Sequence, residues 1–516
     1  MPRPLRTAVV LALIVTLSAC ATTTVAPYAR PAPEHARQPQ AVGPFSALEA
    51  GIHADYGPDL SGFRLLDSNE DGLRWRLALL DSAQHSIDVQ YYLWYGDAAG
   101  RILAKRLLDA ADRGVKVRML VDDLNTLISD GGTVSMRDQV AAWMDSHPNV
   151  EVRLFNPWSN REVMARVGES LADFERANQR MHNKAMIVDN RAVILGGRNV
   201  GDEYMGLNAE FNFHDLDVLG IGPVARQTST IFDLYWNSEW VMPVSALRIH
   251  VSTEEQDEAR HQLVKRLEGA TSLARFPIAP QTWTDELAAL PGTLYIGASQ
   301  VYADLPKAGG LEQVMLERIH EILTKPQSEL LIVNAYIIPA DRGIAQLQKL
   351  ANRGVVIKIM TNSLASHDVP AVNSHYKKWR KPILETGSEL FELRHDAKIQ
   401  SVADTPPTRS EFVGLHSKAM VIDRKEVYIG SMNFDPRSAW INTEMGVFIE
   451  SRGLGEALAR LIERDIQPAN SWQVELDENG GLRWVNDEET VTSQPARNWW
   501  QRVEDVLFMV VPKEYY

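Results

Sequence analysis

The strongest constraint on the fold of this chain is a pattern, H-x-K-x-x-x-x-D, that occurs twice in its 516 residues. The copies read HNKAMIVD at 182–189 and HSKAMVID at 416–423. Each copy is followed, at the same distance from its histidine, by an asparagine, Asn199 or Asn433. A single copy would be typical of an ordinary surface strand. Two copies in matching surroundings indicate a duplicated structural unit.

The duplication extends upstream of both copies. Residues 110–124 (AADRGVKVRMLVDDL) and 350–364 (LANRGVVIKIMTNSL) each contain the end of an apolar-periodic helix, then Arg-Gly, then an alternating β-branched run. Gly114 and Gly354 suit helix C-caps, where a left-handed residue ends a helix before a strand. Two strand-like runs also match, HSIDVQYYL at 85–93 and ELLIVNAYI at 329–337. Strands that alternate with helices predict an α/β fold, here as two similar domains.

The matches place the two domains at 45–245 and 311–465. The segment between them, 246–310, is partly charged, and we expect a connecting helix and loop there. The tail, 466–516, ends in the aromatic-rich sequence NWWQRVEDVLFMVVPKEYY. This tail has two interpretations: an amphipathic aromatic patch on a membrane interface, or a C-terminal helix packed on the core.

The N-terminus is predicted to be a lipoprotein signal peptide covering residues 1–19. After two arginines, residues 8–19 are apolar but too few to span a bilayer as a mature helix. The stretch ends in Leu-Ser-Ala-Cys, which resembles a bacterial lipobox, and Cys20 is the only cysteine in the chain. Lipid attached to Cys20 would anchor the protein. The alternative is an ordinary signal peptide with an incidental cysteine.

Residues 20–44 are rich in proline and alanine, which is typical of an extended tether. Residue 21 is alanine and not aspartate. By resemblance to lipoprotein sorting rules, this favours the outer membrane of a Gram-negative cell. We therefore expect a membrane-anchored lipoprotein that faces the periplasm.

The composition is that of a globular protein, with 45% hydrophobic residues and a net charge of −14. An acidic surface repels phosphate backbones, so nucleic acid is a disfavoured partner. One cysteine allows no intrachain disulfide. The sequence has no His/Asp/Glu cluster with metal-ligand spacing, so we expect neither a metal nor another cofactor.

Each motif is predicted to form a β-hairpin, because two apolar runs flank the turn-prone stretch 189–191 (Asp-Asn-Arg). A turn centred after Asn190 makes His182 face Asn199 and Lys184 face Gly197. By the same count, two further pairs face each other in the second copy: His416 with Asn433, and Lys418 with Ser431.

An imidazole, an ammonium and an amide on one surface suit a phosphate diester. Lysine places a positive charge near the non-bridging oxygens, and asparagine donates hydrogen bonds to them. A neutral histidine can attack phosphorus and form a covalent intermediate. A second histidine can protonate the leaving oxygen. Two motifs in one chain supply both histidines if the halves face each other across a pseudo-twofold axis.

A nucleophilic histidine also needs an acceptor for its other ring nitrogen. The candidates are Asp215 and Glu444, one downstream of the motif in each half, with Asp217 as a rival to Asp215. The motif aspartates, Asp189 and Asp423, lie by the hairpin turns. We interpret these two as structural residues that cap the turn or pair with a nearby base.

Together with their continuations GGRN and GSMN, the motifs resemble the paired HKD motifs of the phospholipase D superfamily. The resemblance covers about residues 45–465. It implies two α/β domains, each a mixed sheet flanked by helices, with the active site at their interface. It also implies that His182 is the nucleophile and His416 the general acid. The implied catalytic set is His182, Lys184, Asp189, His416, Lys418 and Asp423, and the implied phosphate ligands are Asn199, Asn433 and Ser431.

Further segments resemble bacterial cardiolipin synthases, particularly the C type. They include DVQYYLWYGDAAGRIL, GGRNVGDEY, DLDVLGIGP, MTNSLASHDVP and GSMNFDPRSAWINTEMG. This resemblance implies transfer of a phosphatidyl group from phosphatidylethanolamine or phosphatidylglycerol to phosphatidylglycerol, with a phospholipid membrane as partner. A lipobox is not a defining feature of those enzymes. Sorting to the outer membrane would also separate the enzyme from the inner membrane.

Three alternatives use the same residues differently. Attack of water on the phosphohistidine would make the protein a phospholipase D that yields phosphatidic acid. A nuclease would also fit the fold, although the acidic charge disfavours it. The last alternative is a tethered scaffold with an inactive site. In addition, the basic-aromatic run YKKWRK at 376–381 is either a binding site for anionic head groups or a solvated helix face.

Overall fold

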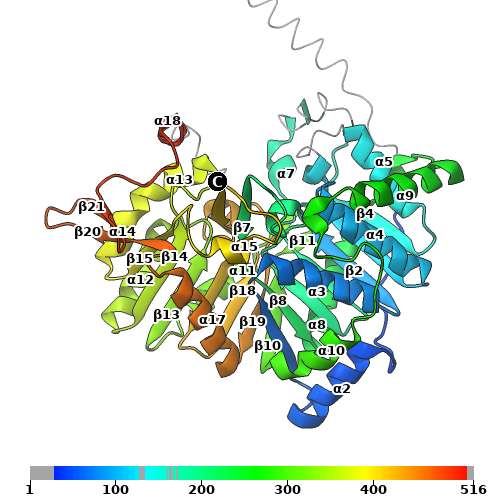
Figure 1. Cartoon of the computed structure of the whole chain (residues 1–516), viewed down its shortest axis with the longest axis horizontal. Helices are drawn as coiled ribbons and strands as arrows, with labels where there is room; N and C mark the ends of the chain where they lie inside the picture. Colours follow the sequence, from blue (N-terminus) through cyan, green and yellow to red (C-terminus); the bar gives the residue numbers. More distant parts are fainter. Residues whose placement is uncertain are drawn as a thin grey trace, which may run out of the picture.

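The structure, a computed structural model, describes residues 28–126, 134–159, 161, 166, 168–169 and 172–507. Two similar halves lie side by side, each with a β-sheet and helices packed against it (Figure 1). The predicted α/β fold with two similar domains is confirmed. The signal peptide, Cys20 and the last nine residues of the tail lie outside the described residues.

The sheet of the first half is mixed. In order across the sheet, its strands are β1 (Ser61–Leu66), β8 (Asp217–Ile221), β6 (Ala192–Gly196), β5 (Ala185–Val188), β2 (Ser86–Tyr91), β3 (Lys116–Asp122), β4 (Val150–Phe155) and β9 (Val241–Pro243). Strands β2, β3 and β4 are parallel to one another, and the remaining pairs are antiparallel.

The sheet of the second half repeats this arrangement strand for strand. Its strands are β10 (Tyr295–Ala303), β19 (Met445–Glu450), β18 (Glu426–Gly430), β17 (Lys418–Ile422), β13 (Glu329–Asn334), β14 (Val356–Asn362), β15 (Glu389–Leu393) and β20 (Ser471–Leu476), extended by β21 (Leu482–Val485) and β22 (Thr490–Val491). The duplication read from the motifs therefore applies to the whole sheet.

Two strand pairs join the halves. Strand β1 pairs antiparallel with β10, which makes the two sheets continuous. Strands β7 (Phe211–His214) and β16 (Phe412–Leu415) pair in parallel, one from each half. A small hairpin of β11 (Leu305–Lys307) and β12 (Gly310–Glu312) follows β10.

The parallel strands require crossover connections, which helices supply. Helix α4 (Ala98–Asp112) connects β2 to β3, and α12 (Ala340–Asn352) connects β13 to β14. The other described α-helices are α2 (Pro44–Tyr56), α3 (Asn69–Ser82), α5 (Val134–Asp145), α7 (Phe174–Asn178), α8 (Pro223–Trp236), α9 (Thr253–Glu268), α10 (Thr284–Ala289), α11 (Met315–Ile322), α13 (Pro370–Tyr376), α14 (Arg380–Glu385), α15 (Gln400–Ala403), α16 (Pro436–Trp440), α17 (Arg452–Asp465) and α18 (Trp499–Leu507).

The predicted glycine C-caps are confirmed. Gly114 has φ +92° and Gly354 has φ +82°, in the left-handed region. In the first half, the N–H groups of Gly114 and Val115 donate to carbonyls of the last turn of α4, and the second half repeats this geometry. Each glycine thus satisfies carbonyls at the end of its helix and directs the chain into β3 or β14.

One hydrophobic core is shared between the halves. It contains Ile187 and Val193 from the first motif hairpin and Val421 and Ile429 from the second, all at most 1% exposed. Burial of such a side chain stabilises a fold by about 1.5–3 kcal/mol. The two motif hairpins are therefore held against each other by apolar packing from both halves.

The hairpins form as predicted, but their register differs by one residue from the predicted register. Ala185 pairs with Leu195, and Ala419 pairs with Ile429. The predicted pairing assumed a two-residue turn, whereas the ladder leaves a three-residue loop at 189–191, whose first two residues have φ of 53°. The observed register therefore does not place the predicted pairs, such as His182 and Asn199, opposite each other.

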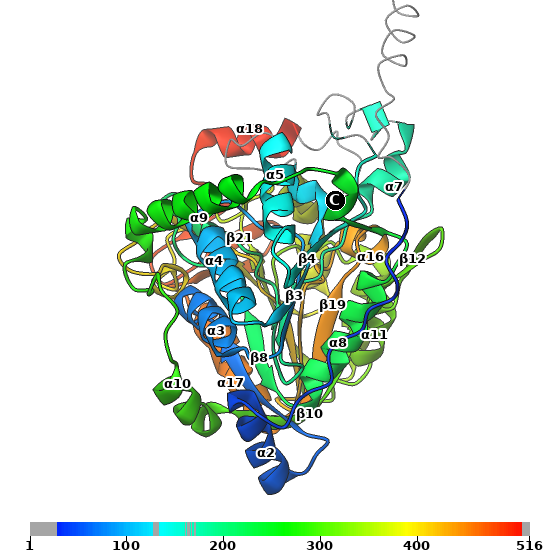
Figure 2. The same cartoon turned by 90° about the vertical axis from the view of Figure 1, so that its right-hand side faces the viewer.

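The described part of the predicted tether is extended, but it is not a free spacer. Its backbone hydrogen-bonds to side chains of α8 and of the residue that follows that helix: Ala36 N–H donates to Asp233 and Glu34 N–H to Asn237. Figure 2 shows this segment running beside α8 toward α2. Among the described residues, we find no helix that is both long and apolar enough to cross a membrane.

The strand pairing bears on the domain limits. Strand β10 lies within the predicted connecting segment and β20 within the predicted tail, yet both pair with strands of the second sheet. Because they occupy the places of β1 and β9 in the first sheet, we propose that the second domain extends over 295–491. The segment before it contains a helix, as expected, namely α9.

Candidate active site

The two motif histidines lie where the halves meet. His182 donates its backbone N–H to the carbonyl of Thr443, at 2.9 Å, and His416 donates to the carbonyl of His214, also at 2.9 Å. Both contacts cross from one half to the other. They extend the β7–β16 pairing on one side and the Met181–Thr443 bridge on the other. The same backbone geometry therefore occurs twice, as a pseudo-twofold arrangement requires.

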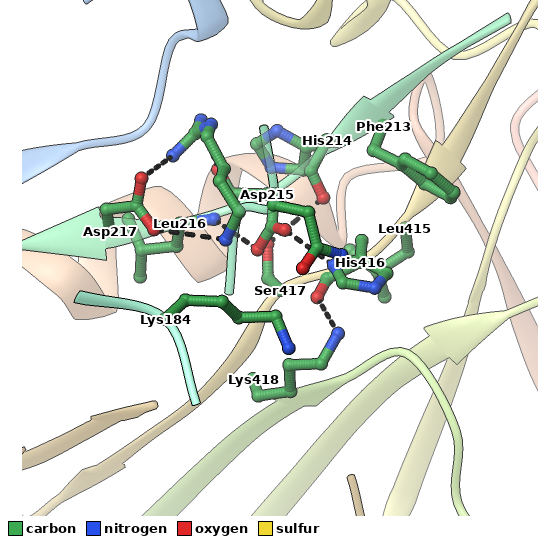
Figure 3. A network of polar contacts seen from close by, with 12 residues as sticks. Lys184, Phe213, His214, Asp215, Leu216, Asp217, Leu415, His416, Ser417 and Lys418 are labelled. Carbon is green, nitrogen blue, oxygen red and sulfur yellow. Dashed lines mark hydrogen bonds and ion pairs between the residues drawn. The ribbon is translucent and has the colours of Figure 1, made fainter. Parts of the chain in front are cut away.

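Each histidine is held at Nδ1 by a carboxylate from the opposite half. His182 Nδ1 lies 2.9 Å from Glu444 Oε2. His416 Nδ1 lies 2.6 Å from Asp215 Oδ2, and Figure 3 shows this second pair. These carboxylates follow Thr443 and His214 directly in the sequence. A carboxylate at Nδ1 fixes the orientation of the ring and directs Nε2 away from it. The rival candidate, Asp217, pairs instead with Arg76 Nη2 at 2.9 Å.

The two motif lysines are buried beside the histidines. Lys184 Nζ donates to the carbonyl of His182 at 2.6 Å, and Lys418 Nζ donates to the carbonyl of His416. Figure 3 shows the ammonium ends of the two lysines pointing toward each other. Burial lowers the pKa of Lys184 well below its usual range and that of Lys418 to about 8. Two buried lysines with their ammonium groups close together form a site that favours binding of an anion.

Burial acts on the pKa of both histidines, more strongly for His182 than for His416. Burial, followed by the charges of Lys184 and Lys418, lowers the pKa of His182 well below its usual value. Burial also lowers the pKa of His416, together with Lys418, although Asp215 opposes this effect. A neutral imidazole has the free electron pair that a nucleophile or a base needs.

The two carboxylates differ in charge preference. Burial raises the pKa of Glu444 well above its usual value, against the opposing effects of Lys184 and Ser431. Burial alone would also raise the pKa of Asp215, but His416, Lys418 and Arg198 together hold it well below its usual range. The pseudo-symmetric site therefore has a firmly ionised carboxylate beside His416 and a more easily protonated one beside His182.

The residue that lies beside each carboxylate, just after the hairpin, differs between the halves. Ser431 Oγ donates to Glu444 Oε2 at 2.5 Å. The equivalent position in the first half is Gly197, where an added Cβ would overlap Asp215 Oδ1. A serine therefore supports the glutamate, and a glycine leaves room for the aspartate.

The predicted asparagine ligands are both buried, at 1% exposure for Asn199 and 5% for Asn433. Asn199 Oδ1 accepts a long hydrogen bond, 3.3 Å, from the N–H of Leu93. Asn433 Oδ1 has no partner among the described residues. A buried amide oxygen without a partner is costly, and as an acceptor it suits a donor group of a ligand and not a phosphate oxygen.

The motif aspartates lie away from the histidines, at the hairpin turns. Asp189 accepts hydrogen bonds from three consecutive backbone N–H groups, those of residues 84–86, at 2.7–3.2 Å. Asp423 does the same with residues 327–329, at 2.8–3.2 Å. Each carboxylate thus holds the start of β2 or β13 against its hairpin. The contact lies with the backbone before a neighbouring strand and not, as was expected, with the turn or a base, so the structural role of these two residues stays a prediction.

Several residues near the histidines were not expected from the sequence. The ring of Tyr92 lies edge-on to His182, with 5.0 Å between centroids, and that of Tyr204 lies edge-on to His416 at 5.2 Å. Asp304, at the end of β10, accepts the backbone N–H of Glu444 at 2.9 Å. Asp368 acts electrostatically on His416 and Lys418. Tyr92 carries a signal from the repeat, because the aligned strands place Tyr336 at its equivalent position. Tyr204 and Asp368 lie in segments that resemble cardiolipin synthases, but no role was predicted for them.

The family comparison decides the class of the protein. A family model described as "Cardiolipin synthase, PLD-like domain" matches residues 77–236 and 319–466, which together are more than half of the chain. The chain belongs to this family. It is therefore an enzyme of the phospholipase D type, a phosphatidyltransferase or phosphodiesterase, and the predicted resemblance is confirmed.

Individual relatives agree with the family assignment. The chain is 36% identical over 483 residues to cardiolipin synthase C of Escherichia coli, an alignment that covers 89% of this chain and 96% of that protein. It is 25% identical over 465 residues to cardiolipin synthase B of the same organism, with 86% of each protein covered. The crystal structure of a phosphatidylserine synthase from Haemophilus influenzae has a similar fold, with a TM-score of 0.52 and 14% identity, and the match covers 82% of this chain and 89% of that one.

Proposed function

We propose that this protein transfers a phosphatidyl group from a phospholipid, phosphatidylethanolamine or phosphatidylglycerol, to phosphatidylglycerol and so forms cardiolipin. The observation that carries the proposal is the pair of imidazoles, each held at Nδ1 by a carboxylate of the opposite half, beside two buried lysines. The names of the relatives supply the substrate class.

In the first step, His182 Nε2 attacks the phosphorus of the donor lipid. A P–N bond forms, and the bond from phosphorus to the head-group oxygen breaks. Asp215 and the negative charge of the bound phosphodiester favour the imidazolium form of His416, which gives a proton from Nε2 to that oxygen, so the head group leaves as an alcohol and not as an alkoxide. The ionised Asp215 supports this role of His416, because a carboxylate stabilises the imidazolium that must give up the proton.

In the second step, the roles reverse. His416 Nε2 takes the proton from a hydroxyl of phosphatidylglycerol, whose oxygen attacks phosphorus. The P–N bond breaks, cardiolipin leaves, and His182 is restored. Two displacements at phosphorus replace one, which lowers the barrier that a direct exchange would face.

The lysines and the asparagines are the proposed phosphate ligands, with Ser431 contributing through its contact with Glu444. Lys184 and Lys418 are the cations for the two non-bridging oxygens. Burial lowers their pKa values, and a bound phosphodiester would favour their charged forms. The asparagines would bind through the Nδ2 donors of their amides, because Oδ1, including the unpaired Oδ1 of Asn433, can only accept a hydrogen bond.

A product analysis tests the proposal. The purified protein is mixed with vesicles of phosphatidylethanolamine and phosphatidylglycerol, and lipids are identified by mass spectrometry. We expect cardiolipin with wild type, none with His182→Ala, and normal amounts with His147→Ala, a matched control at a histidine that pairs with Asp112 outside the site. Phosphatidic acid in place of cardiolipin would make water the acceptor and contradict the synthase proposal.

We also propose that Cys20 is acylated and that the protein is a periplasm-facing lipoprotein, with Ala21 favouring the outer membrane. The support is the lipobox-like sequence. Cells fed a clickable fatty acid should label wild type and not Cys20→Ser, and fractionation should place the labelled protein with outer-membrane markers. Equal labelling of both proteins would contradict acylation at Cys20.

A further inference from the structure

Helix α18 has its polar and apolar faces reversed relative to a helix that packs on a hydrophobic core. Trp499, Trp500 and Leu507 are 71%, 51% and 59% exposed. Gln501 and Asp505, in contrast, are 7% and 2% exposed. A helix in water usually buries its large apolar side chains. The orientation needs a reason outside the described fold.

Specific polar contacts fix this orientation. Asp505 accepts hydrogen bonds from Asn373 Nδ2 at 2.6 Å and from Lys377 Nζ at 2.7 Å, both from the α13 region. Gln501 Nε2 donates to the carbonyl of Leu364 at 3.2 Å. These buried contacts tie the polar face of α18 to the fold, so that the tryptophans have to face outward.

The helix is attached to a segment that reaches the candidate active site. Besides the contact of Gln501 with Leu364, Arg497 Nη1 donates to the carbonyl of Ala365 at 2.6 Å. The same segment continues to His367, which stacks on Tyr336, and to Asp368, which influences the pKa of Lys418. Helix α18 and the residues before it are therefore connected, through residues 364–368, to the surroundings of Lys418.

The surroundings of α18 fit a bilayer. Lys378 and Lys381 are exposed on the neighbouring turn, within the basic-aromatic run noted in the sequence, although the whole chain has a charge of −14. Tryptophan prefers the membrane–water interface, and nearby lysines favour anionic head groups. In both views, α18 lies at the end of the molecule opposite α2, as does α7, whose Phe174 is 45% exposed (Figures 1 and 2).

We propose that the face of α18 formed by Trp499, Trp500 and Leu507 rests in the interface of a lipid bilayer that contains anionic phospholipid. This contact holds the lipid surface on the side of the fold where Asp368, the exposed end of the otherwise buried 364–368 segment, lies. Activity on vesicles rests on the proposed function, whereas the contact of α18 with the bilayer does not.

The contact is tested by fluorescence quenching. The full chain is reconstituted with vesicles of phosphatidylethanolamine and phosphatidylglycerol whose acyl chains carry bromine, which quenches tryptophans at short range. We expect wild type to lose more emission than a W499S/W500S variant, and Tyr56→Ser to behave as wild type. Tyr56 is the matched control, because it is an aromatic residue, 57% exposed, on α2 at the opposite end. Equal quenching of wild type and the double variant would overturn the proposal.

A kinetic readout separates membrane contact from a purely structural role. The double variant should raise KM for vesicles by about tenfold, because interfacial contacts concentrate the enzyme on its substrate. Turnover of a short-chain, monomeric phospholipid should stay unchanged. Equal losses on both substrates, or a change in molecular mass without any change in quenching, would mean that α18 supports the fold or binds a second copy. If no lipid is turned over at all, the proposed function fails and the quenching result still decides the contact.

Discussion

At the residue scale, the site depends on two carboxylate–imidazole pairs that cross between the halves. Glu444 and Asp215 do not touch the reacting phosphate in the proposed mechanism. They act through His182 and His416 by holding Nδ1, so each is a positioning residue. The sequence indicated both carboxylates, but it could not indicate the crossing, because spacing along a chain does not reveal which half lies beside which histidine.

Removal of either acceptor should slow the reaction strongly. We expect Asp215→Asn and Glu444→Gln each to reduce kcat by about 10²–10⁴-fold, because the imidazole loses its orientation and tautomer. The effect should fall on kcat and less on KM. Asp112→Asn is the matched control, since Asp112 pairs with His147 Nε2 at 3.1 Å away from the motifs. A control that loses as much activity as the two variants would contradict the positioning role.

Lys418 gives the site a pH dependence. Its pKa is about 8, so the ammonium is present below that pH and is lost as the pH rises through it. We expect kcat/KM, which reports the free enzyme, to fall above about pH 8. In Lys418→Arg the descending limb should move to higher pH, because a guanidinium keeps its charge. If Lys418→Arg is active and the descending limb of its kcat/KM profile is unchanged, a group other than Lys418 causes that limb.

At the element scale, the two hairpins share one framework but differ where they meet the carboxylates. Gly197 makes room for Asp215, and Ser431 supports Glu444. We expect Gly197→Ser, which copies the second half into the first, to abolish activity by displacing Asp215. Ser431→Gly should reduce activity by about tenfold, through one lost hydrogen bond. Activity measurements on both variants decide this, and a fully active Gly197→Ser enzyme would contradict the close packing.

We propose that the motif aspartates act on the fold and not on the chemistry. Asp423 holds three consecutive backbone N–H groups before β13. Asp423→Ala should therefore reduce the free energy of unfolding by about 1–3 kcal/mol. Activity at low temperature should stay within about threefold of wild type, as expected for a surface turn. Denaturant unfolding and initial rates measure the two effects, and loss of activity without loss of stability would place Asp423 in the mechanism.

Much of each element could be read from the sequence. The repeated letters predicted the hairpins, the glycine C-caps and the matched strands. The hairpin register was wrong by one residue, because the ladder leaves a three-residue loop at 189–191. Strand β10 was not predicted, because it lacks a clear apolar alternation. It joins the two sheets, and many of its residues are half-buried or exposed. The outward tryptophans of α18 are decided by tertiary contacts of Gln501 and Asp505.

At the scale of the whole molecule, one chain supplies both halves of the site. The shared core of Ile187, Val193, Val421 and Ile429 holds the hairpins together within that chain. A mixture of His182→Ala and His416→Ala proteins should therefore remain inactive, because each molecule carries one defective histidine. Activity assays of the mixture against each variant alone test this. Recovery toward a quarter of wild-type activity would show that the site forms between two chains.

The measurement that tests the central claim most directly is detection of the covalent intermediate. A donor lipid labelled at phosphorus is mixed with wild type and with H182A, quenched within milliseconds at alkaline pH, and digested for mass spectrometry. The account predicts a phosphatidyl group on His182 in wild type and no labelled histidine in H182A. Label on His416 would reverse the two roles, and the absence of any labelled histidine during turnover would contradict the two-step mechanism.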